Sequence, residues 1–346
     1  MPKATTDVRL QRQQIAAPRF RKPEDLVRFM GAVQAQDYLG ALWAIGMRLQ
    51  GDVTEADVEA AIAARRIVRT WPMRGTLHFV AAEDVHWMLA LLTPRVVARA
   101  DPRYRELRLS GLDFIRSGEA LARALEGGGA FTRAETYAAL EKAGVSTEGQ
   151  RGIHIVGYLA QKGLLCHGPR RGKQPTFVLL DEWIGAPGNR PPRDEALASL
   201  AQRYLASHGP ATVHDFAWWS GLLMHEAQAA MAAAGAGPHE PRAPRRRTTA
   251  VALLPMWDEY LVAYKDRGHA TAHLPTPSRA SVFTAVIVID GTVRGAWKRT
   301  LTPKAVRIEL DFWLKPSAAE RQAAEVAAER YARFLGKAFQ LARSRR

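Results

Sequence analysis

The sequence is poor in cysteine and in long apolar runs. Its 346 residues include one cysteine, Cys166, which excludes an internal disulfide and a zinc site built from several thiolates. No stretch approaches the roughly 18 unbroken apolar residues that a membrane span requires. The first fourteen residues are polar and charged and lack the apolar core of an export signal. We therefore expect a cytoplasmic protein without a membrane partner.

Acidic residues are also few relative to basic ones. The chain holds 49 Lys and Arg against 34 Asp and Glu, which gives a net charge of +15 and a pI of about 10.3. Such an excess favours a polyanionic partner, most often the phosphates of a nucleic acid. Ten of the basic residues are lysines, so 39 are arginines, whose planar fork suits phosphates and base edges. A genome rich in G and C would also raise the arginine share, but it explains the net excess less well. We expect a nucleoid-associated protein.

The first third of the chain has the element order of a winged helix. Apolar residues at helical spacing predict a helix that starts near Pro23. Two further helices are predicted at 38–49 and 55–66. The period then changes, and two strands at 67–71 and 76–80 are joined by a turn. Three helices followed by a hairpin is the winged-helix order.

This order recurs along the chain, so a structural repeat is predicted. The fold class expected is mainly α with β (α+β), with tandem winged-helix units followed by a small C-terminal β domain capped by a helix. The predicted parts are 1–110, a winged-helix unit with the catalytic motif; 111–190, a second winged-helix unit; 191–247, a winged-helix-like unit and a basic linker; and 248–346, the β domain with a closing helix over 317–343.

Two basic segments are predicted to contact the DNA backbone. Arg170, Arg171 and Lys173 lie in the loop between the two predicted strands of the second unit, where a wing would meet phosphates. The linker contributes Arg245, Arg246 and Arg247. For the linker, a solvated basic run beside prolines is the alternative.

The most informative segment is Gln34-Ala35-Gln36, which lies in a predicted break between two helices. On a helix, residues two apart point about 200° away from each other. In extended backbone they point to the same side. Two amide side chains in this break can therefore be directed at one small volume, such as a water molecule and a charged carbon.

The motif and its surroundings resemble the AlkZ-like, YcaQ-related DNA glycosylases. Gln34-Ala35-Gln36 is similar to the Gln–aliphatic–Gln motif of that family, and the segments 34–43, 69–80, 209–221 and 257–267 also look like family segments. Members of the YcaQ type carry Asp at the second motif position. Because this sequence has Gln36 there, it resembles the AlkZ-like members more than the YcaQ type. The resemblance implies tandem winged helices around a concave channel with a β domain. It also implies release of N-alkylated purines and unhooking of interstrand crosslinks.

The chemistry of two amides is consistent with a cationic leaving group. Glutamine is no general base near neutral pH, but alkylation at N7 of guanine or N3 of adenine makes the base a good leaving group already. The enzyme then has to position water and stabilise an oxocarbenium-like sugar. No lysine is indicated as a Schiff-base nucleophile. We expect a monofunctional glycosylase that leaves an abasic site in alkylated double-stranded DNA, acts as a monomer and needs neither cofactor nor metal, with Gln34 and Gln36 as catalytic residues.

Further residues are candidates for supporting roles. Asp37 either supplies a carboxylate or caps the helix that follows it, and capping is favoured. On the first hairpin, Arg74 is placed to reach phosphate, and Thr76 and His78 share one face of a strand. Asp258, Tyr264 and Arg267 approach the lesion or the backbone, or else form a helix-cap and ion-pair cluster within the β domain.

Two other functions remain open from the sequence. A non-catalytic winged-helix transcription regulator would bind specific sites and tolerate the loss of Gln34 and Gln36, but such proteins usually dimerise. A DNA-binding subunit of a helicase or nuclease would need a stable protein partner.

Overall fold

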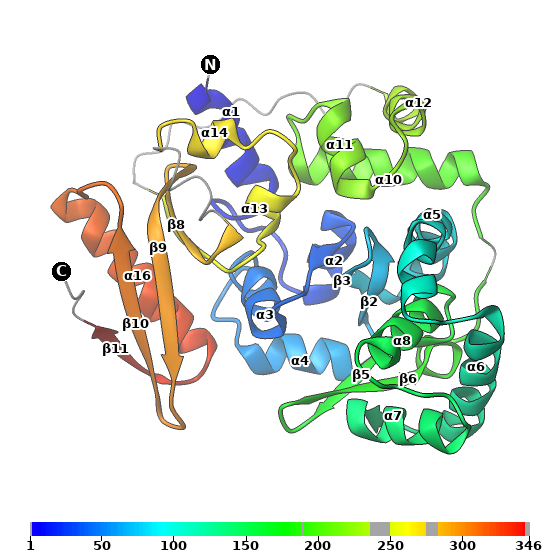
Figure 1. The fold of residues 1–346 in the computed structure, drawn as a ribbon. Coiled ribbons are helices and arrows are strands. Elements are labelled where there is room, and N and C mark those ends of the chain that lie inside the picture. Colours follow the sequence, from blue (N-terminus) through cyan, green and yellow to red (C-terminus); the bar gives the residue numbers. More distant parts are fainter. Residues whose placement is uncertain (1, 189, 236–249, 275–282, 343–346) are drawn as a thin grey trace. The chain divides into compact units, whose positions relative to one another are not determined.

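The computed structural model describes residues 2–188, 190–235, 250–274 and 283–342 (Figure 1). The chain divides into two compact units. Unit 1 combines Met1–Val58 with Ala198–Arg346, and unit 2 is Glu59–Leu197. The chain therefore leaves unit 1 once and returns to it. The boundaries of the four sequence-predicted parts stay predictions.

Unit 2 is a small antiparallel sheet packed with helices. Its strands are β2 (Ile67–Met73), β3 (Thr76–Ala81), β4 (Phe131–Thr132), β5 (Leu165–Arg171) and β6 (Gln174–Leu179), and they lie in the order β3-β2-β5-β6-β4. Its helices are α5 (Val85–Glu106), preceded by the short η1 (Ala82–Asp84), and α6 (Gly111–Leu125), α7 (Arg133–Lys142), α8 (Arg151–Gln161) and α9 (Leu180–Ile184). Helix α4 (Glu55–Ala63) spans the boundary between the units.

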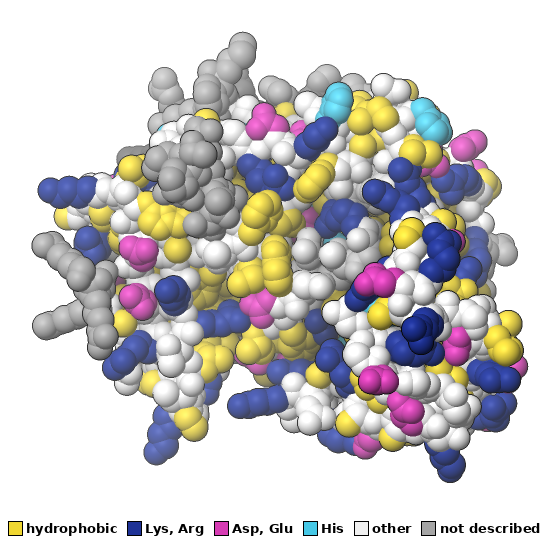
Figure 2. Space-filling view, in the orientation of Figure 1, with side chains coloured by type: hydrophobic (Ala, Val, Ile, Leu, Met, Phe, Trp, Pro, Cys, Tyr) yellow, Lys and Arg dark blue, Asp and Glu magenta, His cyan; other side chains and the backbone are white. Residues whose placement is uncertain are grey.

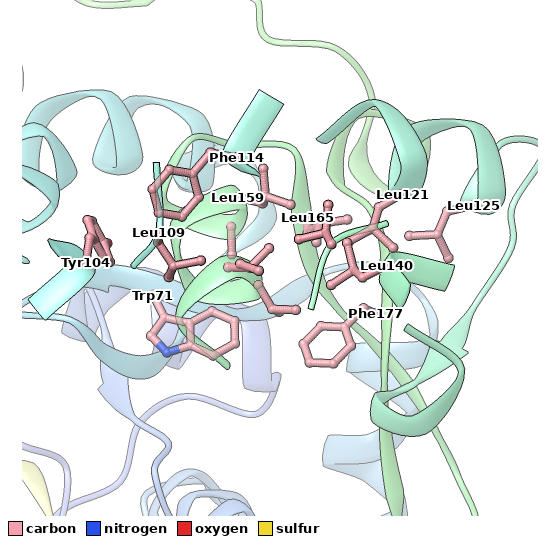
Figure 3. Packing of buried hydrophobic residues seen from close by; sticks show 14 residues of the cluster. Trp71, Tyr104, Leu109, Phe114, Leu121, Leu125, Leu140, Leu159, Leu165 and Phe177 are labelled. Atoms are coloured by element: carbon pink, nitrogen blue, oxygen red, sulfur yellow. The ribbon is translucent and has the colours of Figure 1, made fainter. Parts of the chain in front are cut away.

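Aromatic and aliphatic side chains fill the space between the sheet of unit 2 and its helices. Figure 3 shows Trp71 and Phe177 of the sheet beside Leu140, Leu159 and other apolar residues of the cluster. The ring of Phe114 stacks on that of Tyr158 with centroids 3.9 Å apart. Burial of these apolar surfaces is the main stabilising contribution to the unit.

Two helices of unit 2 begin with reciprocal side-chain caps. Ser110 accepts a hydrogen bond from the backbone N–H of Asp113, whose carboxylate accepts from the Ser110 N–H in return. Thr132 and Glu135 repeat the arrangement at α7. Such pairs satisfy N–H groups that the helix itself leaves open.

Unit 1 is assembled from both ends of the chain. Its helices are α1 (Pro2–Arg12), α2 (Pro23–Met30), α3 (Tyr38–Gly46), α10 (Arg193–His208, which begins just before the boundary), α11 (Val213–Ser220), α12 (Met224–Ala234), α13 (Glu259–Val262), α14 (Gly268–Thr271) and α16 (Ala318–Phe334). Its strands are β1 (Val33–Gln34), β7 (Val251–Leu254), β8 (Val286–Ile289), β9 (Thr292–Leu301), β10 (Ala305–Phe312) and β11 (Ala338–Ala342). The α+β class expected from the sequence is confirmed.

The C-terminal sheet has the strand order β11-β10-β9-β8-β7, in which only the pair β10–β11 is parallel. In Figure 1 helix α16 runs alongside β10 and β9. Tyr331 of α16 packs edge-on against Trp43 of α3 and Trp297 of β9, both at 5.1 Å between centroids. The N-terminal helices and the C-terminal sheet thus share one core.

The prediction of a closing helix over 317–343 is wrong in its last part. Helix α16 ends at Phe334, and residues 338–342 form strand β11. Gly336 takes the left-handed conformation with φ of 62°, and the Lys337 N–H donates to the carbonyl of Ala332 at 3.0 Å. This closes the helix by a glycine cap.

Candidate active site

The glutamine motif lies in non-helical backbone between α2 and α3, as the sequence predicts. Gln34 ends the short strand β1 and is half-buried, Ala35 is buried, and Gln36 is exposed in a bend. Just upstream, Gly31 has a φ of 78°, and a Cβ there would lie 3.3 Å from the Trp219 ring. A glycine is therefore needed where α2 ends and the motif begins.

A buried carboxylate holds the backbone of the motif. Glu259, the first residue of α13, is 1% exposed. Its Oε1 accepts the backbone N–H of Gln34 at 2.8 Å, and its Oε2 accepts the indole N–H of Trp219 at 3.0 Å. The Nε2 of His208 lies 3.5 Å from the same Oε2. Glu259 was not among the residues predicted from the sequence, because nothing in its neighbourhood along the chain signals a partner 225 residues away.

Asp37 occupies the N-cap position of α3, but its side chain makes no capping hydrogen bond. The favoured interpretation of Asp37 as a cap is wrong in this respect. Its Oδ2 instead accepts from Arg299 Nη2 at 3.2 Å. The carboxylate also lies over Gly40, where a Cβ would come within 2.5 Å of Oδ2. An ion pair with β9 therefore holds this carboxylate beside the motif.

Asp258 is enclosed in an ion pair. Both of its carboxylate oxygens accept from the guanidinium of Arg48, at 2.6 and 2.8 Å, and both side chains are almost wholly buried. Oδ1 also caps α13 by accepting the Tyr260 N–H. Asp258 thus forms both the helix cap and the ion pair that the sequence offered as the alternative to a contact with the lesion.

Tyr264 and Arg267 are also engaged within unit 1. The Tyr264 hydroxyl donates to the carbonyl of His208 at 2.6 Å, and burial raises the pKa of this phenol to about 12. Arg267 donates to the carbonyl of Leu261 at 3.0 Å, and its guanidinium lies over the rings of Trp218 and Phe283. Roles for Asp258, Tyr264 and Arg267 at the lesion stay predictions.

The two neighbouring tryptophans of α11 have opposite environments. Trp219 is fully buried, but Trp218 is 46% exposed. Trp218 donates its indole N–H to the carbonyl of Val262 at 3.0 Å.

The candidates on the first hairpin of unit 2 form a small cluster of their own. Arg74 is the turn residue with φ of 55°, and its Nη2 lies 3.3 Å from Nε2 of His78. His78 is fully buried on β3, and its Nδ1 lies 3.0 Å from the carbonyl oxygen of Thr76. Arg74, Thr76 and His78 are thus brought together, and their part in the reaction stays a prediction.

The predicted wing of unit 2 is the hairpin of β5 and β6. Arg170 forms an ion pair with Glu59, and Arg171 pairs with Glu135 at 2.6 Å. Lys173 is exposed in the turn. Arg245, Arg246 and Arg247 lie outside the described residues.

Basic side chains spread over the surface. Figure 2 shows Lys and Arg across the face in view, with fewer Asp and Glu among them. Within the described ranges, no group of three or more His, Cys, Asp or Glu side chains is arranged to hold a metal ion. Among the helices of that same part, none is both long and apolar enough to cross a membrane.

The family model of AlkZ-like DNA glycosylases matches residues 27–334. An interstrand DNA cross-link repair glycosylase of Streptomyces sahachiroi is 28% identical over 322 residues, which cover 84% of this chain and 85% of that protein. The solved structure of the DNA glycosylase AlkZ of Streptomyces sahachiroi superposes with a TM-score of 0.77 at 24% identity, over 98% of this chain and 99% of the other. The likeness to the solved structure shows a shared fold.

Proposed function

The chain belongs to the AlkZ-like DNA glycosylase family and is a DNA glycosylase, and from this premise we propose that it hydrolyses the N-glycosidic bond of bulky, cationic N-alkylated purines. The enzyme is a monofunctional glycosylase, and its reaction leaves an abasic site. Gln34 and Gln36 are the catalytic residues. The protein acts as a monomer on damaged double-stranded DNA in the cytoplasm.

The placement of the glutamine motif carries this proposal. Gln34 is in extended backbone and the segment that bears it is fixed at the N–H of Gln34. Amide dipoles on a fixed backbone can hold a water molecule and stabilise positive charge on the sugar without reorganising during the reaction. They cannot protonate a neutral leaving base, which would need a general acid. This restricts the substrates to bases that alkylation has already made cationic.

We extend the proposal to interstrand crosslinks. The related protein of Streptomyces sahachiroi is named as a crosslink repair glycosylase. Most glycosylases flip a base into a tight pocket, which a base tied to the opposite strand cannot enter. A motif whose second glutamine is exposed on the surface suits such a substrate.

The test is base release from a duplex that carries one N7-alkylguanine, with spontaneous depurination subtracted. We expect wild-type protein to form abasic sites and the Gln34→Ala/Gln36→Ala variant to lose at least about 100-fold in rate while DNA binding is retained. Gln322→Ala, at an exposed glutamine of α16, is the matched control and should keep the wild-type rate. A duplex with uracil should give no release.

Two outcomes would contradict the proposal. If base release survives the double substitution, the glutamines are not the catalytic residues, and Asp37 becomes the next candidate. Absence of release from this and other cationic adducts would refute the proposed substrate class.

A further inference from the structure

We propose that Glu259 is a positioning residue for the reaction, which holds the backbone of Gln34 so that the side chains of the motif have a fixed direction. This inference rests on the proposed catalytic role of Gln34. Glu259 is fully enclosed, so it acts through Gln34 and does not touch the substrate. Its bond to the Gln34 N–H is the direct link.

The two oxygens of Glu259 connect the motif to two other segments. Oε1 binds the N–H of Gln34 in β1, Oε2 binds the indole of Trp219 in α11, and the carboxylate itself begins α13. Hydrogen bonds to a carboxylate are about twice as strong as those between neutral groups. The position of the Gln34 backbone is therefore set by a rigid, buried acceptor.

Trp219 adds rigidity to this arrangement. Its ring is fully buried, and it packs against Gly31, which lies three residues before Gln34. The same side chain thus fixes Glu259 through its N–H and the chain entering the motif through its ring. Trp219 of α11 therefore holds both the acceptor Glu259 and, through Gly31, the segment that leads to the donor Gln34.

A fixed backbone matters because the proposed chemistry is mainly positioning. Neither amide supplies a strong base, so the rate depends on where the amides hold the water and direct their dipoles. A misplacement of about 1 Å is able to reduce such a rate by about 100-fold. Catalytic groups need to be held within about 0.5 Å of the productive geometry by their supporting residues.

Glu259→Gln tests the positioning role. Glutamine has the same shape, but it offers one acceptor oxygen and an NH₂ group, so either Gln34 or Trp219 then faces a donor. We expect the single-turnover rate of base release to fall by about 10- to 100-fold, with the Kd for the duplex unchanged within about twofold.

A double-mutant cycle separates positioning from a general structural role. If Glu259 acts through the motif, adding Glu259→Gln to the Gln34→Ala/Gln36→Ala variant lowers its remaining rate by no more than about twofold. Losses that multiply would overturn the proposal, as would a wild-type rate in folded Glu259→Gln.

The matched control is Asp215→Asn. Asp215 is also a buried carboxylate of unit 1 that accepts a backbone N–H from a distant segment, that of Lys265 at 2.9 Å. Among the described residues, the hydrogen bonds of Asp215 are made with Thr212, Lys265 and Asp266 and not with the glutamine motif. Its substitution should lower stability and leave the rate of the folded protein unchanged.

Hydrogen exchange gives a readout that needs no activity. The Gln34 amide should exchange faster in Glu259→Gln than in wild type or Asp215→Asn, and equal exchange would overturn the proposal. This separates failure of the positioning role from failure of the proposed substrate class, which would show as absence of release by wild type. Where Glu259→Gln does not fold, Glu259→Asp keeps the charge and shortens the reach. If Glu259→Asp released the base at the wild-type rate and its Gln34 amide exchanged as in wild type, the positioning role of Glu259 would be overturned.

Discussion

His269 is an imidazole kept neutral by its surroundings. Its Nδ1 lies 2.7 Å from Nη1 of Arg9, so the ring nitrogen accepts a hydrogen bond from a cation. Burial, reinforced by the charge of Arg9, lowers the pKa of His269 to about 3. Burial also lowers the pKa of His208 and of His167. These three groups resist protonation in the folded protein.

Acid should therefore destabilise the protein well before its carboxylates titrate. In the unfolded chain a histidine takes up a proton near pH 6.5, while folded His269 does so only near pH 3. Between these values the unfolded state binds more protons, so the free energy of unfolding falls as the pH is lowered from about 6.5 towards 3. Urea denaturation at about pH 7.5 and about pH 5 should show this loss, and His269→Asn should make it smaller. Equal losses in both proteins would contradict the assignment to His269.

Residue roles were predictable only where neighbours along the chain carry the signal. The Gln34-Ala35-Gln36 motif is complete within three residues, so its position between two helices could be inferred. Glu259 has partners 225 and 40 residues away, and no local pattern joins them. The same reason explains Asp37, whose capping position was visible in the sequence but whose partner Arg299 was not.

At the scale of elements, one glycine separates a helix from a strand. Gly336 ends α16 in the left-handed conformation, and open space surrounds the position of its missing Cβ. The helical period of the preceding residues continued past this glycine in the sequence prediction, so β11 was missed. Its parallel partner β10 lies more than thirty residues earlier in the sequence. In the register of the pair, Ala305 is opposite Ala338.

Gly336→Ala isolates the cost of that turn. Because no atom lies near the new Cβ, the substitution acts only through backbone strain and should destabilise the protein by about 1 kcal/mol. Gly157→Ala in the interior of α8, also in open space, should stabilise by up to about 1 kcal/mol. Chemical denaturation measures both. A neutral Gly336→Ala would show that this turn tolerates an L side chain without cost.

Helix α5 lies in a segment for which no element was predicted from the sequence. It runs for 22 residues and contains Pro94 and Pro102. Proline inside a helix removes a hydrogen bond and is normally a break signal. Packing of the α5 residues Met88 and Leu92 into a buried environment outweighs the local propensity.

At the scale of the whole molecule, the net charge of +15 makes DNA affinity dependent on salt. Some basic side chains are committed to ion pairs within the protein, as Arg170 and Arg171 show. Exposed Lys173 at the turn of the same hairpin is better placed for phosphate. Counting arginines in the sequence does not distinguish these two uses.

Lys173→Ala should reduce the dependence of the binding constant on salt. Each lost phosphate contact makes the slope of log K against log salt less negative by about 0.9. Lys173→Arg keeps the charge and should leave the slope unchanged. Titration of an undamaged duplex at several salt concentrations gives the slopes, and an unchanged slope in Lys173→Ala would remove this residue from the DNA contact.

The interruption of unit 1 by unit 2 has a consequence for synthesis on the ribosome. Gln34 emerges before unit 2, but Glu259 follows 225 residues later, and Tyr331, which packs on Trp43, follows later still. Meanwhile residues 59–197 are complete and contain their own core. A nascent chain therefore carries its glutamines without the carboxylate that holds them until 225 further residues have been made, and the hydrogen bond to the motif forms only after unit 2 has been synthesised.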